Sequence, residues 1–224
     1  HRHHCCLRST CPGMFISSRQ FSFIILFALA FVSVQSFVSQ TKLLYSRPKL
    51  HHATLSMISE GSDIPTGVIV DLVENTDAEP CSFNNAQDLG EVLRSHSKAV
   101  IFGVPGAFTP TCSAQHLPGF IEKADEIRAK GVDEIYCLSV NDRFVMKAWA
   151  EATPGCIEKG IKMIADGNAE YTSALGVVKD GTGSRMGLRA KRFAAIIEAG
   201  RVSSMKVDEK GMVETSAEKI LELL

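Results

Sequence analysis

Apolar residues follow two different spacings between residue 60 and the C-terminus. The segments Lys98–Val104 and Glu134–Val140 are nearly continuous apolar runs, as expected for strands that are covered on both faces of a sheet. Between them, Pro110–Ala129 is predicted to be a helix, because its apolar residues recur at intervals of three and four. These residues are Leu117, Phe120, Ile121, Ala124 and Ile127. Buried strands and an amphipathic helix therefore alternate in this part of the chain.

The alternation continues to the end of the chain. It predicts strands at Gly67–Val73 and Lys162–Ala165, a helix capped by Asp142, a short helix at Glu170–Leu175, a hairpin of Arg192–Glu198 and Arg201–Val207, and a terminal helix at Ile220–Leu224. Thr215 and Glu218 have the spacing of a capping box before the last helix. This order indicates an α/β domain with a thioredoxin-like fold, in which helices flank a mixed central sheet.

The charges divide the chain into two parts. Residues 1–59 contain six Lys or Arg and no Asp or Glu, whereas residues 60–224 contain 18 basic and 25 acidic residues and carry a formal charge of -7. We therefore expect a leader over residues 1–59, removed from the mature protein, and one globular domain over residues 60–224. Because the domain is mildly acidic, no basic face for nucleic acid is expected on it. The overall composition excludes a collagen-like repeat, a disordered polyelectrolyte and a polytopic membrane protein.

Within the leader, Phe21–Val34 is an uncharged apolar run. As a helix it would span only about 21 Å, short of the ~30 Å hydrocarbon core, so it is typical of a signal-peptide hydrophobic region. The following segment, Phe37–Met57, is basic, rich in Ser and free of acids, as transit peptides are. The combination resembles the bipartite plastid leaders of algae with complex plastids and predicts a plastid location, with mitochondrial or secretory targeting as the alternative. We expect no stable membrane insertion of the mature protein.

Residues 1–13 precede the first methionine and are interpreted as translated upstream sequence. Their histidines and cysteines invite a metal-site interpretation, but their spacing matches no structural zinc pattern and no second ligand pair follows at finger distance. The residues concerned are His3, His4, Cys5, Cys6 and Cys11. We therefore predict no metal site.

The segment Pro105–Cys112 lies where a predicted buried strand passes into a helix, a position at which α/β folds expose reactive groups. Thr109 is expected to cap the helix and Pro110 to occupy its first position, which places Cys112 in the first turn. Free N–H groups and the helix dipole stabilise an anion there, so a sizeable thiolate fraction is expected near neutral pH. The alternative, a small buried hydrophobic residue, fits the preceding Pro/Gly-rich loop less well.

A disulfide reductase of this fold would carry Cys-x-x-Cys at the same helix start. Here the tetrapeptide is Thr109-Pro110-Thr111-Cys112, in which a hydroxyl replaces the first thiol. A hydroxyl beside a single activated thiolate suits a small polar substrate that must be oriented for attack. The tetrapeptide therefore argues against simple dithiol exchange.

The segment Gly103–Phe120, GVPGAFTPTCSAQHLPGF, resembles the peroxidatic motif of type II (peroxiredoxin five-like) peroxiredoxins of the plant type. The resemblance continues through Cys137–Asp142 and Gly187–Phe193 and covers residues 64–224. It implies a thiol-dependent peroxidase that reduces hydrogen peroxide and organic hydroperoxides by way of a cysteine sulfenic acid. Antioxidant defence and cell redox homeostasis are the implied roles.

The resemblance also implies residue roles. Cys112 is the peroxidatic cysteine, Thr109 orients the peroxide and Pro105 shields the thiolate. Arg192 matches the active-site arginine and fits developing charge because it stays cationic and offers several donors. Arg189 is the second choice for that role and is expected to be mostly solvated. His116, one helical turn after Cys112, fits a pocket position, but a packing or capping role is at least as consistent with the sequence.

Regeneration of the thiol has two routes in the family. Cys137 occupies the position of the resolving cysteine in plant-type members, but it lies in an apolar strand and is equally consistent with a buried core thiol. Otherwise glutathione or glutaredoxin attacks the sulfenic acid directly. Cys81 and Cys156 lie in loop-like sequence outside the motif, and Cys156 is expected to be an inert or exposed thiol.

The implied partners are the peroxide substrate, glutaredoxin or thioredoxin, and a second copy in a homodimer. No resident cofactor is expected, because a thiol reductant such as glutathione acts as co-substrate. Two other functions remain open on the residues alone. One is a thioredoxin-like disulfide oxidoreductase, and the other is a non-catalytic redox sensor or holdase that passes oxidation to a client protein.

Overall fold

A mixed sheet forms the centre of the described domain in the computed structural model, which describes residues 57–73 and 86–224. Its strands, in spatial order, are β2 (Ala86–Asp88), β1 (Ile69–Val73), β5 (Lys162–Ala165), β4 (Glu134–Ser139), β3 (Lys98–Val104), β8 (Arg192–Glu198) and β9 (Arg201–Asp208). Strands β3, β4 and β5 are parallel, and the outer pairs are antiparallel. The predicted mixed sheet is therefore confirmed.

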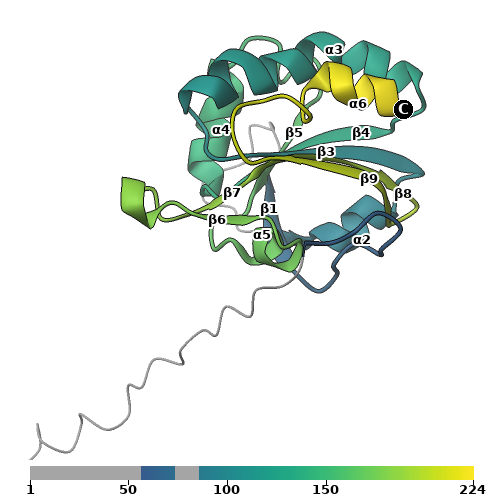
Figure 1. The fold of residues 1–224 in the computed structure, drawn as a ribbon. Coiled ribbons are helices and arrows are strands. Elements are labelled where there is room, and N and C mark those ends of the chain that lie inside the picture. Colours follow the sequence, from purple (N-terminus) through teal and green to yellow (C-terminus); the bar gives the residue numbers. More distant parts are fainter. Residues whose placement is uncertain (1–56, 74–85) are drawn as a thin grey trace, which may run out of the picture. The chain divides into compact units, whose positions relative to one another are not determined.

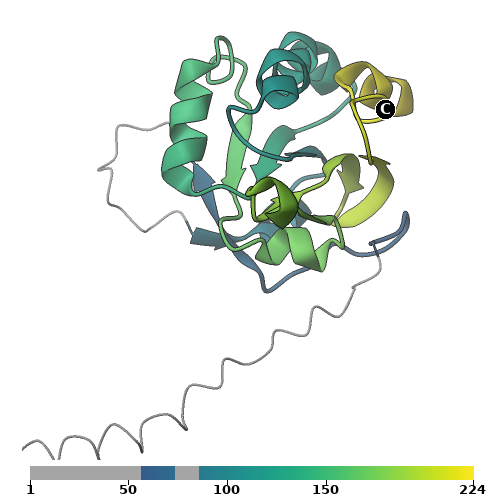
Figure 2. The same ribbon diagram turned by 60° about the vertical axis from the view of Figure 1, so that its left-hand side comes forward.

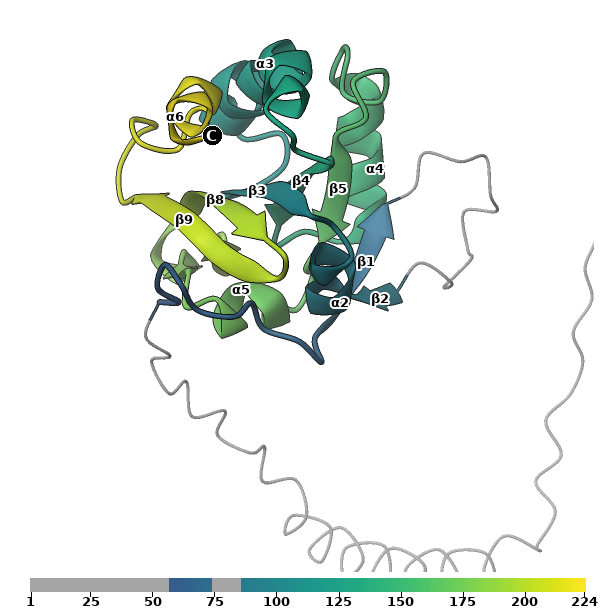
Figure 3. The ribbon, with the colours of Figure 1, turned by 90° about the vertical axis from the view of Figure 1, so that its right-hand side faces the viewer.

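Helices cover both faces of this sheet (Figure 1, Figure 3). One face is covered by α3 (Leu117–Ala129), α4 (Arg143–Ala152) and α6 (Ala217–Leu223), and the other by α2 (Leu89–Arg94) and α5 (Glu170–Ala174). The C-terminal helix α6 packs beside α3, as the turned view in Figure 2 shows. A separate hairpin of β6 (Val178–Asp180) and β7 (Leu188–Ala190) precedes β8.

The two faces explain the continuous apolar runs. Along β3, Val100, Phe102 and Val104 belong to the core under α3, α4 and α6, while Ala99 and Ile101 belong to the core over α2 and α5. Successive side chains of a strand point to opposite faces, so a strand buried on both sides needs apolar residues at every position. The two cores leave only the strand ends available for polar chemistry.

Most predicted elements are present with shifted ends. The β8–β9 hairpin turns at Ala199 and Gly200, whose φ values of 47° and 80° suit the two-residue turn that joins such strands. Asp142 caps α4 by accepting a hydrogen bond from the Val145 N–H at 3.0 Å, as predicted. Strand β2 and helix α2 were not predicted, because three and six residues are too few to show a period.

The capping box before α6 was wrong. Ser216 is the N-cap and accepts a hydrogen bond from the Lys219 N–H at 3.4 Å, and the helix begins at Ala217, before the predicted Ile220. The hydroxyl of Thr215 instead donates to the carboxylate of Asp208. Residues 1–56 of the predicted leader, with its His/Cys cluster, and Cys81 lie outside the described residues. Within the part of the chain that the structure describes, no helix is long and apolar enough to cross a membrane.

Candidate functional site

The loop between β3 and the following helix is closed by its own side chains. The Thr109 hydroxyl donates to the carbonyl of Gly106 at 2.8 Å, and the Thr109 carbonyl accepts from the Ser113 N–H at 2.9 Å, so Thr109 is the residue directly before the helix, as predicted. The Asn141 side chain, which follows β4, accepts from the Ala107 N–H at 3.0 Å and from the Ser139 hydroxyl at 2.8 Å. These bonds fix the segment that leads to Cys112 against the ends of two neighbouring strands.

The helix that follows is interrupted by a π-helical turn at Cys112–His116. Pro118 lacks an N–H and cannot donate to the carbonyl of Ala114, so a regular α-helix is not available here. The Leu117 N–H donates to the Cys112 carbonyl instead. Such turns are frequent at functional sites, and this one places Cys112 and His116 on buried positions.

Arg192 reaches Cys112 from the first position of β8. Its Nη2 lies 3.6 Å from the Cys112 sulfur, and its side chain is only 7% exposed. The guanidinium forms no ion pair with a carboxylate of the described residues. A buried cation normally requires a counter-charge. The Cys112 sulfur is therefore the group in contact with Arg192 that can supply a negative charge.

His116 holds the same guanidinium in place. Its Nδ1 lies 3.0 Å from Arg192 Nη1, and its Nε2 lies 2.9 Å from the carbonyl of Thr215. A carbonyl only accepts, so Nε2 carries the proton and Nδ1 accepts from Arg192. Burial, together with the nearby Arg192 charge, lowers the pKa of His116 to about 4 despite the opposing Thr215 carbonyl. His116 is therefore neutral near pH 7.

The segment between β9 and α6 supplies the backbone carbonyls that accept hydrogen bonds from Arg192 and His116. Arg192 Nε donates to the Gly211 carbonyl at 2.9 Å, as His116 does to Thr215. The Asp208 carboxylate fixes this segment by accepting from the N–H groups of Val213, Glu214 and Thr215 and from the Thr215 hydroxyl, at 2.7–3.2 Å. Burial raises the pKa of Asp208, but these hydrogen bonds outweigh it and the net pKa is lowered.

Arg189 has a different place from the one expected. It is half-buried, and it donates from Nη1 to the Val140 carbonyl at 2.7 Å and from Nε to the Met186 carbonyl at 2.8 Å. The expectation that it is mostly solvated was wrong, because the bond to Val140 ties β7 to the end of β4 and the bond to Met186 closes the turn before β7. Arg192 is the arginine that donates to the Cys112 sulfur.

The other described cysteines are buried. Cys137 lies on β4, and burial, with the nearby Cys156 and Cys112, raises its pKa well above the usual value. Burial, with the nearby Glu158, raises the pKa of Cys156 to about 12, so this thiol is inert and not exposed. All three described cysteines are free thiols. Neither Cys137 nor Cys156 is a good nucleophile in this conformation.

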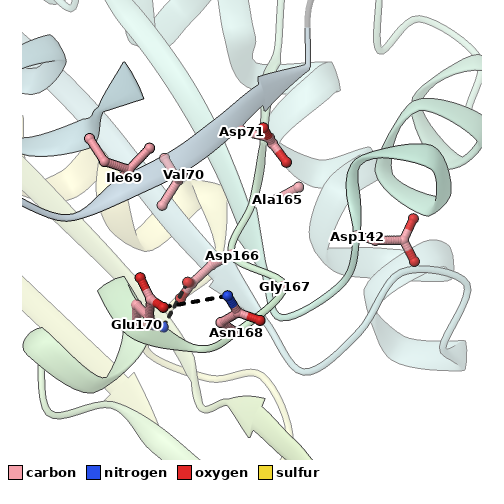
Figure 4. Close-up of a pocket in the computed structure, with 9 residues that line it drawn as sticks. All are labelled: Ile69, Val70, Asp71, Asp142, Ala165, Asp166, Gly167, Asn168 and Glu170. Atoms are coloured by element: carbon pink, nitrogen blue, oxygen red, sulfur yellow. Dashed lines mark hydrogen bonds between the residues drawn. The ribbon is translucent and has the colours of Figure 1, made fainter. Parts of the chain in front are cut away.

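Two surface hollows differ in their relation to this site. One, of about 240 Å³, is lined in part by Pro105 and Arg192. The other, of about 300 Å³, is lined by nine residues, of which four are acidic (Figure 4). In the second hollow Asp166 accepts from the Glu170 N–H at 2.8 Å and Asn168 contacts the Glu170 carboxylate at 3.4 Å, so these polar groups bond to one another. It contains none of the predicted site residues.

Comparison with known proteins finds a matching family and several similar proteins. The Redoxin family matches residues 59–221. Peroxiredoxin-2B of Arabidopsis thaliana is 43% identical over 171 residues, which cover 76% of this chain and all of that protein. Peroxiredoxin-2E-2, chloroplastic, of Oryza sativa subsp. japonica is 51% identical over 135 residues, covering 59% of this chain and 60% of that protein. Peroxiredoxin-2F, mitochondrial, of Arabidopsis thaliana is 34% identical over 171 residues, covering 74% and 84%.

A solved structure agrees with the fold. Reduced Prx3 of Vibrio vulnificus in complex with hydrogen peroxide superimposes with a TM-score of 0.65 at 41% identity, covering 75% of this chain and all of that one. The Redoxin match, over residues 59–221, includes the strands of the sheet and the segment around Cys112.

Proposed function

The chain belongs to the redoxin family as a type II peroxiredoxin, a thiol peroxidase with an antioxidant role, and we propose that its Cys112 is the residue that reduces the peroxide. The observation that carries this assignment is the buried Arg192 guanidinium, which lies 3.6 Å from the Cys112 sulfur and has no carboxylate partner in the described structure. This contact with a buried guanidinium is made by the Cys112 sulfur, and Arg192 makes no such contact with the other described thiols, Cys137 and Cys156.

The Cys112 thiolate attacks one oxygen of the peroxide, and the O–O bond breaks. Sulfur becomes a sulfenic acid, and the leaving oxygen takes a proton to become water or an alcohol. Arg192 is positioned to stabilise the charge that develops on this oxygen. Since the Thr109 hydrogen is donated to Gly106, its oxygen is free to accept a hydrogen bond from the O–H of the peroxide. In this proposal Pro105, which lines the same hollow as Arg192, shields the thiolate.

For regeneration we propose that an external thiol attacks the sulfenic acid, with glutathione and glutaredoxin as the supply. Support comes from the buried Cys137, whose raised pKa keeps it protonated in this conformation. Resolution by Cys137, followed by thioredoxin, requires local opening of the helix that carries Cys112. The reaction needs no resident cofactor, because sulfur and the co-substrate thiol carry all the electrons.

Peroxide consumption by single-cysteine variants of the full chain tests the assignment. Cys112→Ser is expected to abolish it, because a serine hydroxyl is not ionised near neutral pH. Cys156→Ser serves as the matched control, since it also replaces a buried thiol but lies outside the active-site segment. Normal turnover by Cys112→Ser, with the fold checked by circular dichroism, would refute the proposal.

We also propose a plastid location. The acid-free leader supports it, as does the chloroplastic relative at 51% identity. The mitochondrial relative at 34% identity makes mitochondrial targeting the alternative that the experiment must distinguish. A fluorescent protein fused behind residues 14–59 is expected to enter the plastid. A cytosolic or mitochondrial signal would contradict this.

The same family membership leads us to propose a homodimer that packs near the active-site loops. Phe108 and Phe144, which lie in the loop before Cys112 and at the start of α4, are 54% and 56% exposed. In this proposal both side chains are part of the contact surface. Sedimentation equilibrium is expected to give twice the chain mass, and Phe108→Ser with Phe144→Ser is expected to give monomers.

A further inference from the structure

The hollow beside Pro105 and Arg192 has a basic wall. Besides these two residues, its lining contains three lysines, two acidic residues and one glycine. The lysines are Lys179, Lys191 and Lys210, and the other three are Asp208 at the end of β9, Glu209 and Gly211. We call this space the lysine hollow.

The two acidic residues of the lysine hollow offset only part of its charge, because its lining has four cationic and two anionic side chains. The Asp208 carboxylate is bonded to the N–H groups of Val213, Glu214 and Thr215. Glu209 pairs with Lys191 at 2.6 Å. Lys179 and Lys210 are exposed and make no ion pair with any residue that the structure describes. Two ammonium charges therefore remain available to a ligand.

The size of the lysine hollow limits what it can hold. At about 240 Å³ it is smaller than the roughly 300–1,000 Å³ of pockets that enclose a whole ligand. It therefore suits one end of a larger molecule. Because Arg192 lines the hollow and also contacts the Cys112 sulfur at 3.6 Å, the hollow is separated from the thiol by one side chain.

We propose that the lysine hollow binds the carboxylate of a substrate whose reactive group is directed at Cys112, and this rests on the proposed function. Two sources share this chemistry. A hydroperoxide acid would oxidise the thiolate to the sulfenic acid and leave as the hydroxy acid. A carboxylate-bearing thiol, such as glutathione, would condense with the sulfenic acid to a mixed disulfide and release water. The carboxylate itself does not react in either case.

Binding of unreactive probes to the full chain tests this directly. The probes are S-methylglutathione for the thiol and octanoate for the hydroperoxide acid, with octanamide as the neutral counterpart of octanoate. Lys179→Glu with Lys210→Glu is expected to weaken binding of at least one carboxylate probe about tenfold, because each reversal replaces an attraction by a repulsion across a screened distance. Calorimetric titration measures the change.

Lys130→Glu with Lys162→Glu is the matched control. It makes the same change of charge at exposed positions just after α3 and at the start of β5, at the opposite end of the parallel strands. We expect this variant to bind both probes as the unaltered chain does. Weakening of S-methylglutathione alone assigns the lysine hollow to the thiol, and weakening of octanoate alone assigns it to the hydroperoxide.

Equal binding in both double variants, or equal weakening of octanoate and octanamide, would overturn the proposal. Turnover of tert-butyl hydroperoxide with dithiothreitol is measured in parallel on the unaltered chain. Both of these reagents lack a carboxylate, so absence of this turnover counts against the proposed function alone. The probe titrations then still decide whether the lysine hollow binds carboxylates.

Discussion

Acid is expected to destabilise the protein through His116. Burial and the neighbouring Arg192 lower its pKa from 6.5 to about 4, so the folded protein resists its protonation. Between these values the unfolded chain binds a proton that the folded chain does not. The contribution of His116 to stability is therefore complete above about pH 6.5 and is lost as the pH falls toward about 4.

The size of the effect follows from the two pKa values. At about 1.4 kcal/mol per pH unit, the interval between 6.5 and about 4 corresponds to at most about 3 kcal/mol. At about pH 5 some 2 kcal/mol of this is already lost. Against a typical free energy of unfolding of about 5–15 kcal/mol, such a loss is readily measured.

Urea unfolding at about pH 7.5 and about pH 5 is the assay, with the fluorescence of Trp149, the single tryptophan, as the probe. In His116→Gln the amide is able to accept from Arg192 and donate to Thr215 but does not titrate. The stability lost between the two pH values is expected to be about 2 kcal/mol smaller in this variant. An equal loss in both proteins would refute the reasoning, because all other titrating groups, including Asp166, are common to both.

Three further predictions concern the site. Arg192→Lys is expected to lower kcat/KM for hydrogen peroxide by about 10²–10³-fold, since a lysine lacks the two guanidinium nitrogens that contact His116 and Cys112. An unchanged kcat/KM would show that Arg192 takes no part in the mechanism. Asp208→Asn is expected to lower the free energy of unfolding in urea by about 1–3 kcal/mol and to slow the alkylation of Cys112 by iodoacetamide. A loss of stability with unaltered alkylation would limit Asp208 to a structural role. Cys137→Ser is expected to keep glutaredoxin-supported turnover within about twofold of that of the unaltered chain. Loss of this turnover in the variant would show that Cys137 resolves the sulfenic acid.

The strands that build the sheet were predictable because burial on both faces imposes a simple local pattern. Lys98–Val104 and Arg192–Glu198 match β3 and β8 as the structure has them. Short elements such as α2 were not predictable, since six residues do not establish a helical period. The cap of α6 was misassigned because Thr215 and Ser216 are both good capping residues, and only the contact with Asp208 decides between them.

For the site, sequence reasoning proposed Cys112 and Arg192, which the structure brings together. It could not assign His116 or Asp208. His116 bonds to residues 76 and 99 positions away, and no local spacing reports contacts of that range. Asp208 acts through a segment whose carbonyls receive the hydrogen bonds of other side chains. The pattern Pro-x-x-x-Thr-x-x-Cys gives the type of residue needed but not the direction of the Thr109 hydrogen.

The most direct test of the account is the location of the sulfenic acid after a single oxidation. The full chain is treated with one equivalent of hydrogen peroxide in the presence of dimedone, digested and examined by mass spectrometry. We predict the label on Cys112 and none on Cys137 or Cys156, whose thiols are buried with raised pKa values. A label on another cysteine with Cys112 unmodified would contradict the claim that Cys112 reduces the peroxide.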